Sequence, residues 1–213
     1  MTDRIKQWLE QTPEINIQKA LENASRKPIS FEERQTHLNQ VIANVDVLIE
    51  QPIILGYDPQ DPFGRAKDGA LQILKFVKIL AEQHRLSPAE VVFMFYLFIY
   101  VEYNSPEIKM TLDKFNEITK QAREYYFKIK TQKRATFPSV QFPNDWTNAI
   151  KNTKRLIQYT RILVRETNLD AVNLFYAIEL AYTNFCGLED FPMNLNDQKR
   201  IEQQVEAFYE RNI

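Results

Sequence analysis

The chain has 213 residues, of which 44% are hydrophobic and 26% are charged, and its formal net charge is −1. A chain of this length buries about 70% of its unfolded surface, so one large domain or two small ones need no disulfide or metal to hold a core. Its single cysteine cannot form an internal disulfide, and residues 1–10 mix charged with apolar side chains, so we predict a cytoplasmic protein without a secretory signal.

Glycine and proline usage indicates the fold class. Only 4 glycines are present, and few positions can therefore adopt the positive φ that tight hairpin turns require. The 10 prolines stand mostly where a helix begins or a loop runs. We predict an all-α protein, a compact multi-helix bundle rather than an all-β fold.

Capping residues and apolar periodicity predict about nine helices. Ser30 with Glu33, and Ser87 with Glu90, are capping boxes that each start a helix. With ends uncertain by about two to four residues, the predicted helices are 3–11, 13–25, 31–50, 65–85, 88–103, 106–134, 146–167, 170–185 and 195–211.

Two long irregular stretches, 51–64 and 135–145, separate these helices. The second contains Pro138 and Pro143 and is the best candidate for a boundary between lobes. The sequence therefore predicts either a single all-helical domain over 1–213 or two contiguous helical lobes that meet near 135–145.

The segment from Val91 to Val101 is apolar or aromatic on every face of a helix, so protein or lipid must surround it. At 1.5 Å per residue it spans about 16 Å, whereas a bilayer core requires about 30 Å. We therefore predict a central core helix and no membrane span.

Charge is distributed unevenly along the chain. Residues 1–119 carry 13 basic and 17 acidic side chains, residues 120–165 carry 11 and 2, and residues 166–213 carry 3 and 9. A basic middle segment therefore lies between two acidic ends.

The basic segment forms a stripe on the helix predicted at 146–167. Its members step by three and four residues, the spacing of one helix face, and no acidic residue stands between Thr147 and Arg165. Like charges at this spacing repel, and nothing on the helix offsets the repulsion. The stripe consists of Lys151, Lys154, Gln158, Arg161 and Arg165.

The preceding helix, 106–134, has a similar polarity. Its predicted buried face contains Ile108, Leu112, Phe115, Ile118, Ala122, Tyr125 and Ile129, which leaves its basic residues outside. Tyr126 and Phe127 are predicted to be exposed, where they could stack on bases. If the two helices packed as an antiparallel hairpin, their basic surfaces could merge.

Phosphate backbones are the commonest ligands of such a surface. We predict a non-enzymatic subunit of a larger assembly that contacts the backbone of RNA or DNA. The predicted contacts are Lys120, Arg123, Lys128, Lys130, Lys133, Arg134, Lys151, Lys154, Arg155, Arg161 and Arg165.

Three alternatives remain open. The basic faces could be balanced within the fold by the acidic carboxy-terminal segment, where Glu202, Glu206 and Glu210 lie four apart. They could instead dock an acidic protein partner, which would make the chain an interaction adaptor. The aromatic helices could also enclose a small apolar ligand, with Glu179 as the ionisable group of the pocket.

Catalytic and metal-binding patterns are weak. Neither His37 nor His84 has a Glu three residues before it, and Glu33 with His37 would supply only two metal ligands. Asp58 and Asp61 fit a turn better than a calcium loop. Cys186 has no histidine near it in the sequence, and no glycine-rich phosphate loop is present. We predict no enzymatic activity, no metal and no cofactor.

Overall fold

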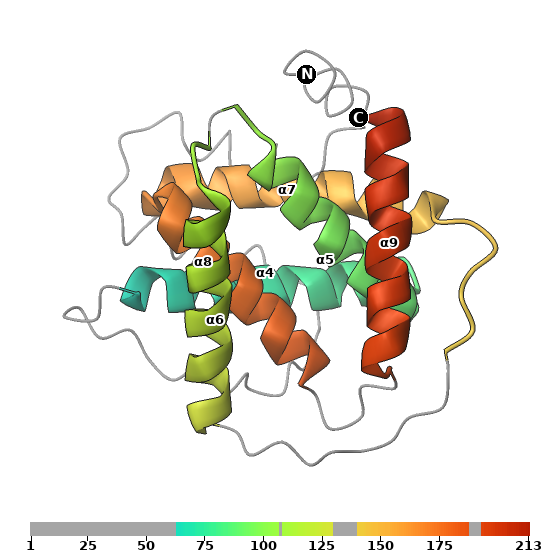
Figure 1. The fold of residues 1–213 in the computed structure, drawn as a ribbon, viewed down its shortest axis with the longest axis horizontal. Coiled ribbons are helices and arrows are strands. Elements are labelled where there is room, and N and C mark those ends of the chain that lie inside the picture. Colours follow the sequence, from blue (N-terminus) through green and yellow to red (C-terminus); the bar gives the residue numbers. More distant parts are fainter. Residues whose placement is uncertain (1–62, 107, 130–139, 188–192) are drawn as a thin grey trace.

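The computed structural model describes residues 63–106, 108–129, 140–187 and 193–213, with side chains at 127–129 excepted. Every regular element in these ranges is an α-helix, which confirms the all-α class. The six helices are α4 (Gly64–Gln83), α5 (Pro88–Tyr103), α6 (Leu112–Ile129), α7 (Thr147–Thr167), α8 (Ala171–Cys186) and α9 (Leu195–Asn212) (Figure 1). The three helices predicted before residue 63 lie outside the described residues, so the total of nine stays a prediction.

Side-chain caps fix where several helices begin. The Ser87 hydroxyl accepts a hydrogen bond from the Glu90 amide at 3.3 Å, and Glu90 Oε2 accepts one from the Ser87 amide at 2.8 Å. The predicted capping box of α5 is therefore confirmed. Asp170 and Asn194 cap α8 and α9 in the same way, by accepting from the backbone amide three residues later.

Helix α6 begins six residues later than the predicted helix 106–134. Thr111 Oγ1 accepts a hydrogen bond from the Lys114 amide at 3.3 Å, so Thr111 caps this helix. Leu112 then stands in the first turn and is 61% exposed, which corrects its predicted place on the buried face. Ile118 and Ala122 are buried as predicted.

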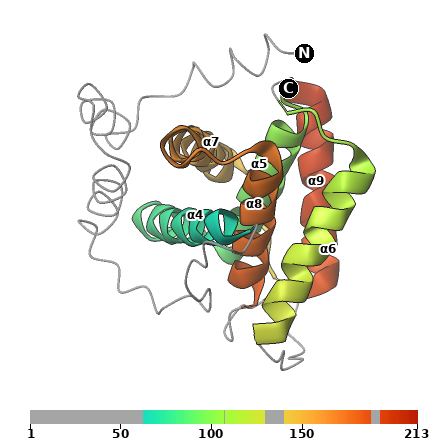
Figure 2. The same cartoon turned by 90° about the vertical axis from the view of Figure 1, so that its left-hand side faces the viewer.

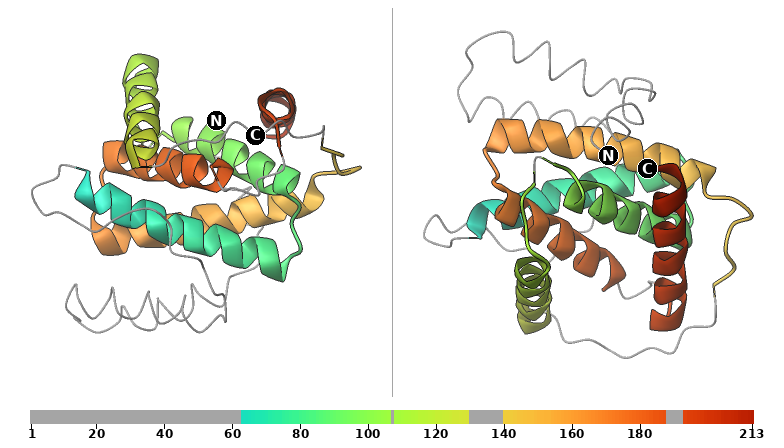
Figure 3. Two further views of the ribbon diagram at one scale, coloured as in Figure 1. Left: turned by 90° about the horizontal axis from the view of Figure 1, so that it is seen from below. Right: turned by 45° about the horizontal axis from the view of Figure 1, so that its top comes forward.

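The six helices form three layers. Helices α4 and α7 lie on one side, α5 and α8 lie in the middle, and α6 and α9 lie on the other side (Figure 2; Figure 3 gives two further views). The main contacts agree: α8 packs against α4 and α6, and α5 packs against α7 and α9. The middle layer therefore separates α7 from α6 and α9.

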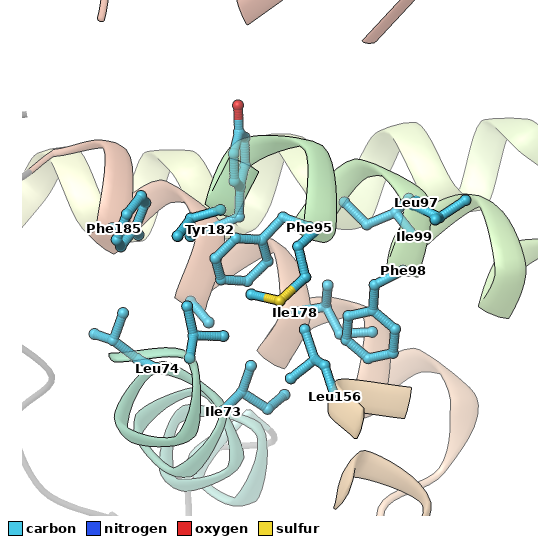
Figure 4. Close-up of a cluster of buried hydrophobic side chains, with 14 of the residues drawn as sticks. Ile73, Leu74, Phe95, Leu97, Phe98, Ile99, Leu156, Ile178, Tyr182 and Phe185 are labelled. Atoms are coloured by element: carbon cyan, nitrogen blue, oxygen red, sulfur yellow. The ribbon is translucent and has the colours of Figure 1, made fainter. Parts of the chain in front are cut away.

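Helix α5 is the centre of the core, as the sequence predicts. Phe95 is fully buried, and its ring lies 5.5 Å from that of Tyr182 and 6.0 Å from that of Phe185. Figure 4 shows side chains of four helices meeting here, including Ile73 of α4 and Leu156 of α7. In the part of the chain that the structure describes, no helix is both long and apolar enough to cross a membrane.

Residues 140–146, at the end of the predicted boundary segment, are held against α9. The Val140 amide donates to Asp197 Oδ2 at 2.8 Å, and Trp146 Nε1 donates to Gln204 Oε1 at 2.8 Å. The Trp146 ring also stacks on Phe93 of α5, with centroids 4.4 Å apart. One buried core therefore includes helices from both sides of this segment.

Candidate functional site

The basic stripe of α7 points outward. Ala149, Leu156 and Leu163 are fully buried on the opposite side of this helix. The outward orientation predicted from residue spacing is confirmed, because Lys151, Arg161 and Arg165 are exposed and Lys154 and Arg155 are half-buried. We call these five residues the α7 basic face.

Two arginines of the α7 basic face pair with carboxylates. Arg161 Nε lies 3.8 Å from Oε1 of Glu102 at the end of α5, and Arg165 Nε lies 3.2 Å from Oε1 of Glu166. The counter-charges of these two arginines thus come from α5 and from α7 itself. This differs from the expectation that Glu202, Glu206 and Glu210 would balance the stripe.

Of the remaining cations of the face, Arg155 lies near the end of α4. Arg155 Nη1 donates a hydrogen bond to Asn152 Oδ1 at 3.0 Å. The pKa of His84 is lowered mainly by the burial of this imidazole and further by the positive charge of Arg155. Burial lowers the pKa of Lys154 as well. Lys151 is exposed and makes no ion pair within the described ranges.

The cations of α6 are placed differently. Lys120 pairs with Glu124 at 3.8 Å, and Lys114, in the first turn, pairs with Glu117 at 3.0 Å. Arg123 is exposed. Burial raises the pKa of both Glu179 and Glu202, and the positive charge of Arg123 opposes this rise.

Helices α6 and α7 belong to opposite outer layers, so they do not form the antiparallel hairpin that would merge their basic surfaces (Figure 2). The other predicted contacts cannot be placed. Lys128 belongs to α6, but its side chain is not described. Lys130, Lys133 and Arg134 lie outside the described residues.

Tyr126 corrects another expectation. Its side chain is 1% exposed, and its hydroxyl donates a hydrogen bond to the Gly187 carbonyl at 3.0 Å. A ring that fastens α6 to the end of α8 has no face to offer a base. The side chain of Phe127 is not among those described.

A second cluster of polar groups surrounds Glu179, where α8 faces α6. Glu179 is 4% exposed, and its Oε2 has no hydrogen-bond partner. Burial raises the pKa of this carboxyl group to about 7, although Arg123 and the Thr119 hydroxyl favour the charged form. The negative charge of Glu202 on α9 also raises the pKa of Glu179.

Tyrosines extend this cluster toward α5 and α9. The Tyr182 hydroxyl lies 3.1 Å from both the Tyr96 hydroxyl and Gln198 Oε1. Burial raises the pKa of Tyr96 to about 12, so both phenols are protonated at neutral pH. The sequence indicated Glu179 and Tyr182 of α8 as polar groups among the apolar helices, but not their neighbours on α5, α6 and α9.

Cys186 is not set up as a nucleophile. Burial raises the pKa of its thiol to about 12, so the reactive thiolate is scarce at neutral pH. The groups that affect this thiol are Tyr182, Arg123 and Glu179 rather than a histidine.

In the described ranges, no three His, Cys, Asp or Glu residues come together as metal ligands. Glu33, His37, Asp58 and Asp61 lie outside these ranges.

The residue that sequence analysis missed at the α7 basic face is Glu102. The signal was present, since Glu102 is the one acidic residue late in an otherwise apolar helix, where a carboxylate needs a partner. No protein-family model, curated protein or solved structure matches this chain.

Proposed function

We propose that the α7 basic face binds the phosphate backbone of a nucleic acid. The observation that supports this proposal is the outward-facing row of five cations on α7, in which Lys151 and Arg155 make no ion pair in the part of the chain that the structure describes. From Lys151 to Arg165 the row is about 21 Å long at 1.5 Å per residue. One strand of a duplex places a phosphate every 3.4 Å or so along the axis, so the row spans several phosphates.

The five cations would contribute unequally. Lys151 and Arg155 make no ion pair within the described residues and would contact phosphate directly, whereas Lys154 is half-buried. Arg161 and Arg165 would first have to exchange Glu102 and Glu166 for phosphate. We therefore expect about two or three effective phosphate contacts, and binding with little sequence preference, because backbone contacts position a protein without specifying a base.

Lys120 and Arg123 do not belong to this proposed surface, because α6 lies in the opposite outer layer. Lys128, Lys130, Lys133 and Arg134 stay predictions. The non-enzymatic role, the cytoplasmic location and membership of a larger assembly belong to the same proposal. Neither an adaptor for acidic proteins nor a ligand carrier has an observation of its own that favours it over backbone binding.

A fluorescence-anisotropy titration tests the proposal on single-stranded RNA, single-stranded DNA and duplex DNA. Two or three phosphate contacts predict that log affinity falls against log salt with a slope of about −2 to −3. Unrelated base sequences should bind within a few-fold of one another. If wild-type protein binds none of the three more tightly than about 100 μM at about 50 mM salt, the proposal is wrong.

A further inference from the structure

Helix α9 carries an acidic face. Glu202, Glu206 and Glu210 lie four residues apart and therefore on one side of the helix; Glu206 and Glu210 are exposed and Glu202 is half-buried. None of them makes an ion pair within the described residues. We call these three residues the α9 acidic face.

The three carboxylates lie close enough to one aromatic side chain to affect its pKa. Tyr100 of α5 is half-buried, and its pKa is raised first by burial and then by Glu206, Glu202 and Glu210. Its ring lies 6.0 Å from that of Tyr209 on α9. A half-buried ring with carboxylates on the neighbouring helix suits a Lys or Arg side chain, which both the ring face and the negative charges attract.

The α9 acidic face and the α7 basic face lie in opposite outer layers. Helix α5 packs against both α7 and α9 and stands between them (Figure 2). Within one molecule the two faces therefore cannot meet. Each remains accessible to a surface of opposite charge on another molecule.

We propose that the α7 basic face of one copy of this chain docks on the α9 acidic face of a second copy. The three glutamates span about 12 Å of helix and fit within the 21 Å or so of the basic row. The contact is heterologous, because it joins two different surfaces, and each added copy leaves one face of each kind open. The assembly therefore grows with protein concentration.

This contact is electrostatic, so salt controls it. Most of the charges involved are exposed, and the screening length falls from about 10 Å at 0.1 M salt to about 3 Å at 1 M. The same α7 basic face would also hold nucleic acid under the proposed function. Nucleic acid and a second copy therefore compete for it, and an added oligonucleotide dissociates the assembly.

Sedimentation velocity tests the proposal with two variants, each of which lacks one face. Glu206→Gln with Glu210→Gln removes charge from the α9 acidic face, and Lys151→Gln with Arg165→Gln removes charge from the α7 basic face. Wild type should form species that grow with concentration at about 50 mM salt and dissociate at about 1 M salt. Each variant alone should be monomeric.

An equimolar mixture of the two variants is the diagnostic sample. The intact α7 face of one variant can bind the intact α9 face of the other, and no further copy can add, so the mixture should stop at a 1:1 dimer. That dimer would also show that both variants are folded. The control Glu117→Gln with Glu124→Gln changes two acidic residues of α6 and should assemble as wild type does.

Wild type that stays monomeric at about 50 mM salt and about 0.5 mM protein would overturn the proposal. A mixture that stays monomeric, or an α9 variant that assembles as wild type does, would overturn it too. The proposed function is judged separately, because the α9 variant should retain its affinity for nucleic acid whether or not the chain self-associates.

Discussion

Arg161 Nε lies 3.8 Å from Oε1 of Glu102 and joins α7 to α5. The Glu102 side chain is only 6% exposed, whereas that of Arg161 is 43% exposed. Arg161, which the sequence predicts to contact phosphate, therefore also contacts the core helix α5. Arg161 and Arg165 differ in this respect, because the partner of Arg165 is its neighbour Glu166.

We expect Arg161→Gln to lower the free energy of unfolding by about 1 kcal/mol, between the values typical of exposed and of buried ion pairs. Arg165→Gln is the matched control and should cost less than about 0.5 kcal/mol. Urea unfolding measures both. A double-mutant cycle with Glu102→Gln should give a coupling of about 0.5–1 kcal/mol, and zero coupling would show that the pair does not stabilise the fold.

Glu179 should make stability depend on pH. Its pKa in the folded protein is about 7, above the ordinary 4.5, so folding takes up a proton between these values. The resulting stabilisation is complete below the ordinary pKa and is lost as the pH rises through the folded value. From about pH 5 to about pH 8, the free energy of unfolding of wild type should fall by about 1–3 kcal/mol more than that of Glu179→Gln.

Urea unfolding of both proteins across that pH range measures this difference. Glu202→Gln is the control, since Glu202 is half-buried and should contribute less to the dependence. Equal pH profiles for wild type and Glu179→Gln would contradict the assignment of the proton to Glu179.

Gly187 is required because of its closeness to Tyr126. A Cβ atom at this position would overlap the phenol ring and hydroxyl, while the φ of −89° is open to any residue, so the cost of a larger residue is steric. We expect Gly187→Ala to cost about 1–3 kcal/mol, as overpacking does. Tyr126→Phe removes only the hydrogen bond and should cost about 1 kcal/mol. Thermal unfolding that leaves Gly187→Ala as stable as wild type would show that the ring can move aside.

Helix ends were predictable where a residue pattern determines them. The capping box at Ser87 and the apolar run behind it place α5 at 88–103, the range that the structure has. At α6 the helical spacing of apolar residues continues back to Ile108, so this spacing alone does not show at which residue the helix begins. The start depends on Thr111, a cap that the sequence contains but that lacks the Glu or Gln three residues later of a capping box.

The arrangement of the layers was not predictable in the same way. Helices α6 and α7 follow one another in the chain, yet α8 covers α6 and α5 covers α7. Which buried faces pair depends on the shapes of side chains from several helices, such as Phe93 against Trp146. The outward direction of the α7 cations followed from their spacing, but the proximity of Glu102 follows only from the packing of α5 on α7.

The central claim is that location, rather than net charge, makes the α7 basic face a binding surface. Lys151→Gln with Arg165→Gln and Lys114→Gln with Lys120→Gln remove the same charge from opposite outer layers of the fold. Anisotropy titrations at about 50 mM salt should show about tenfold or greater loss of nucleic-acid affinity for the α7 variant and a change of less than about twofold for the α6 variant. Equal losses for the two variants would contradict the claim.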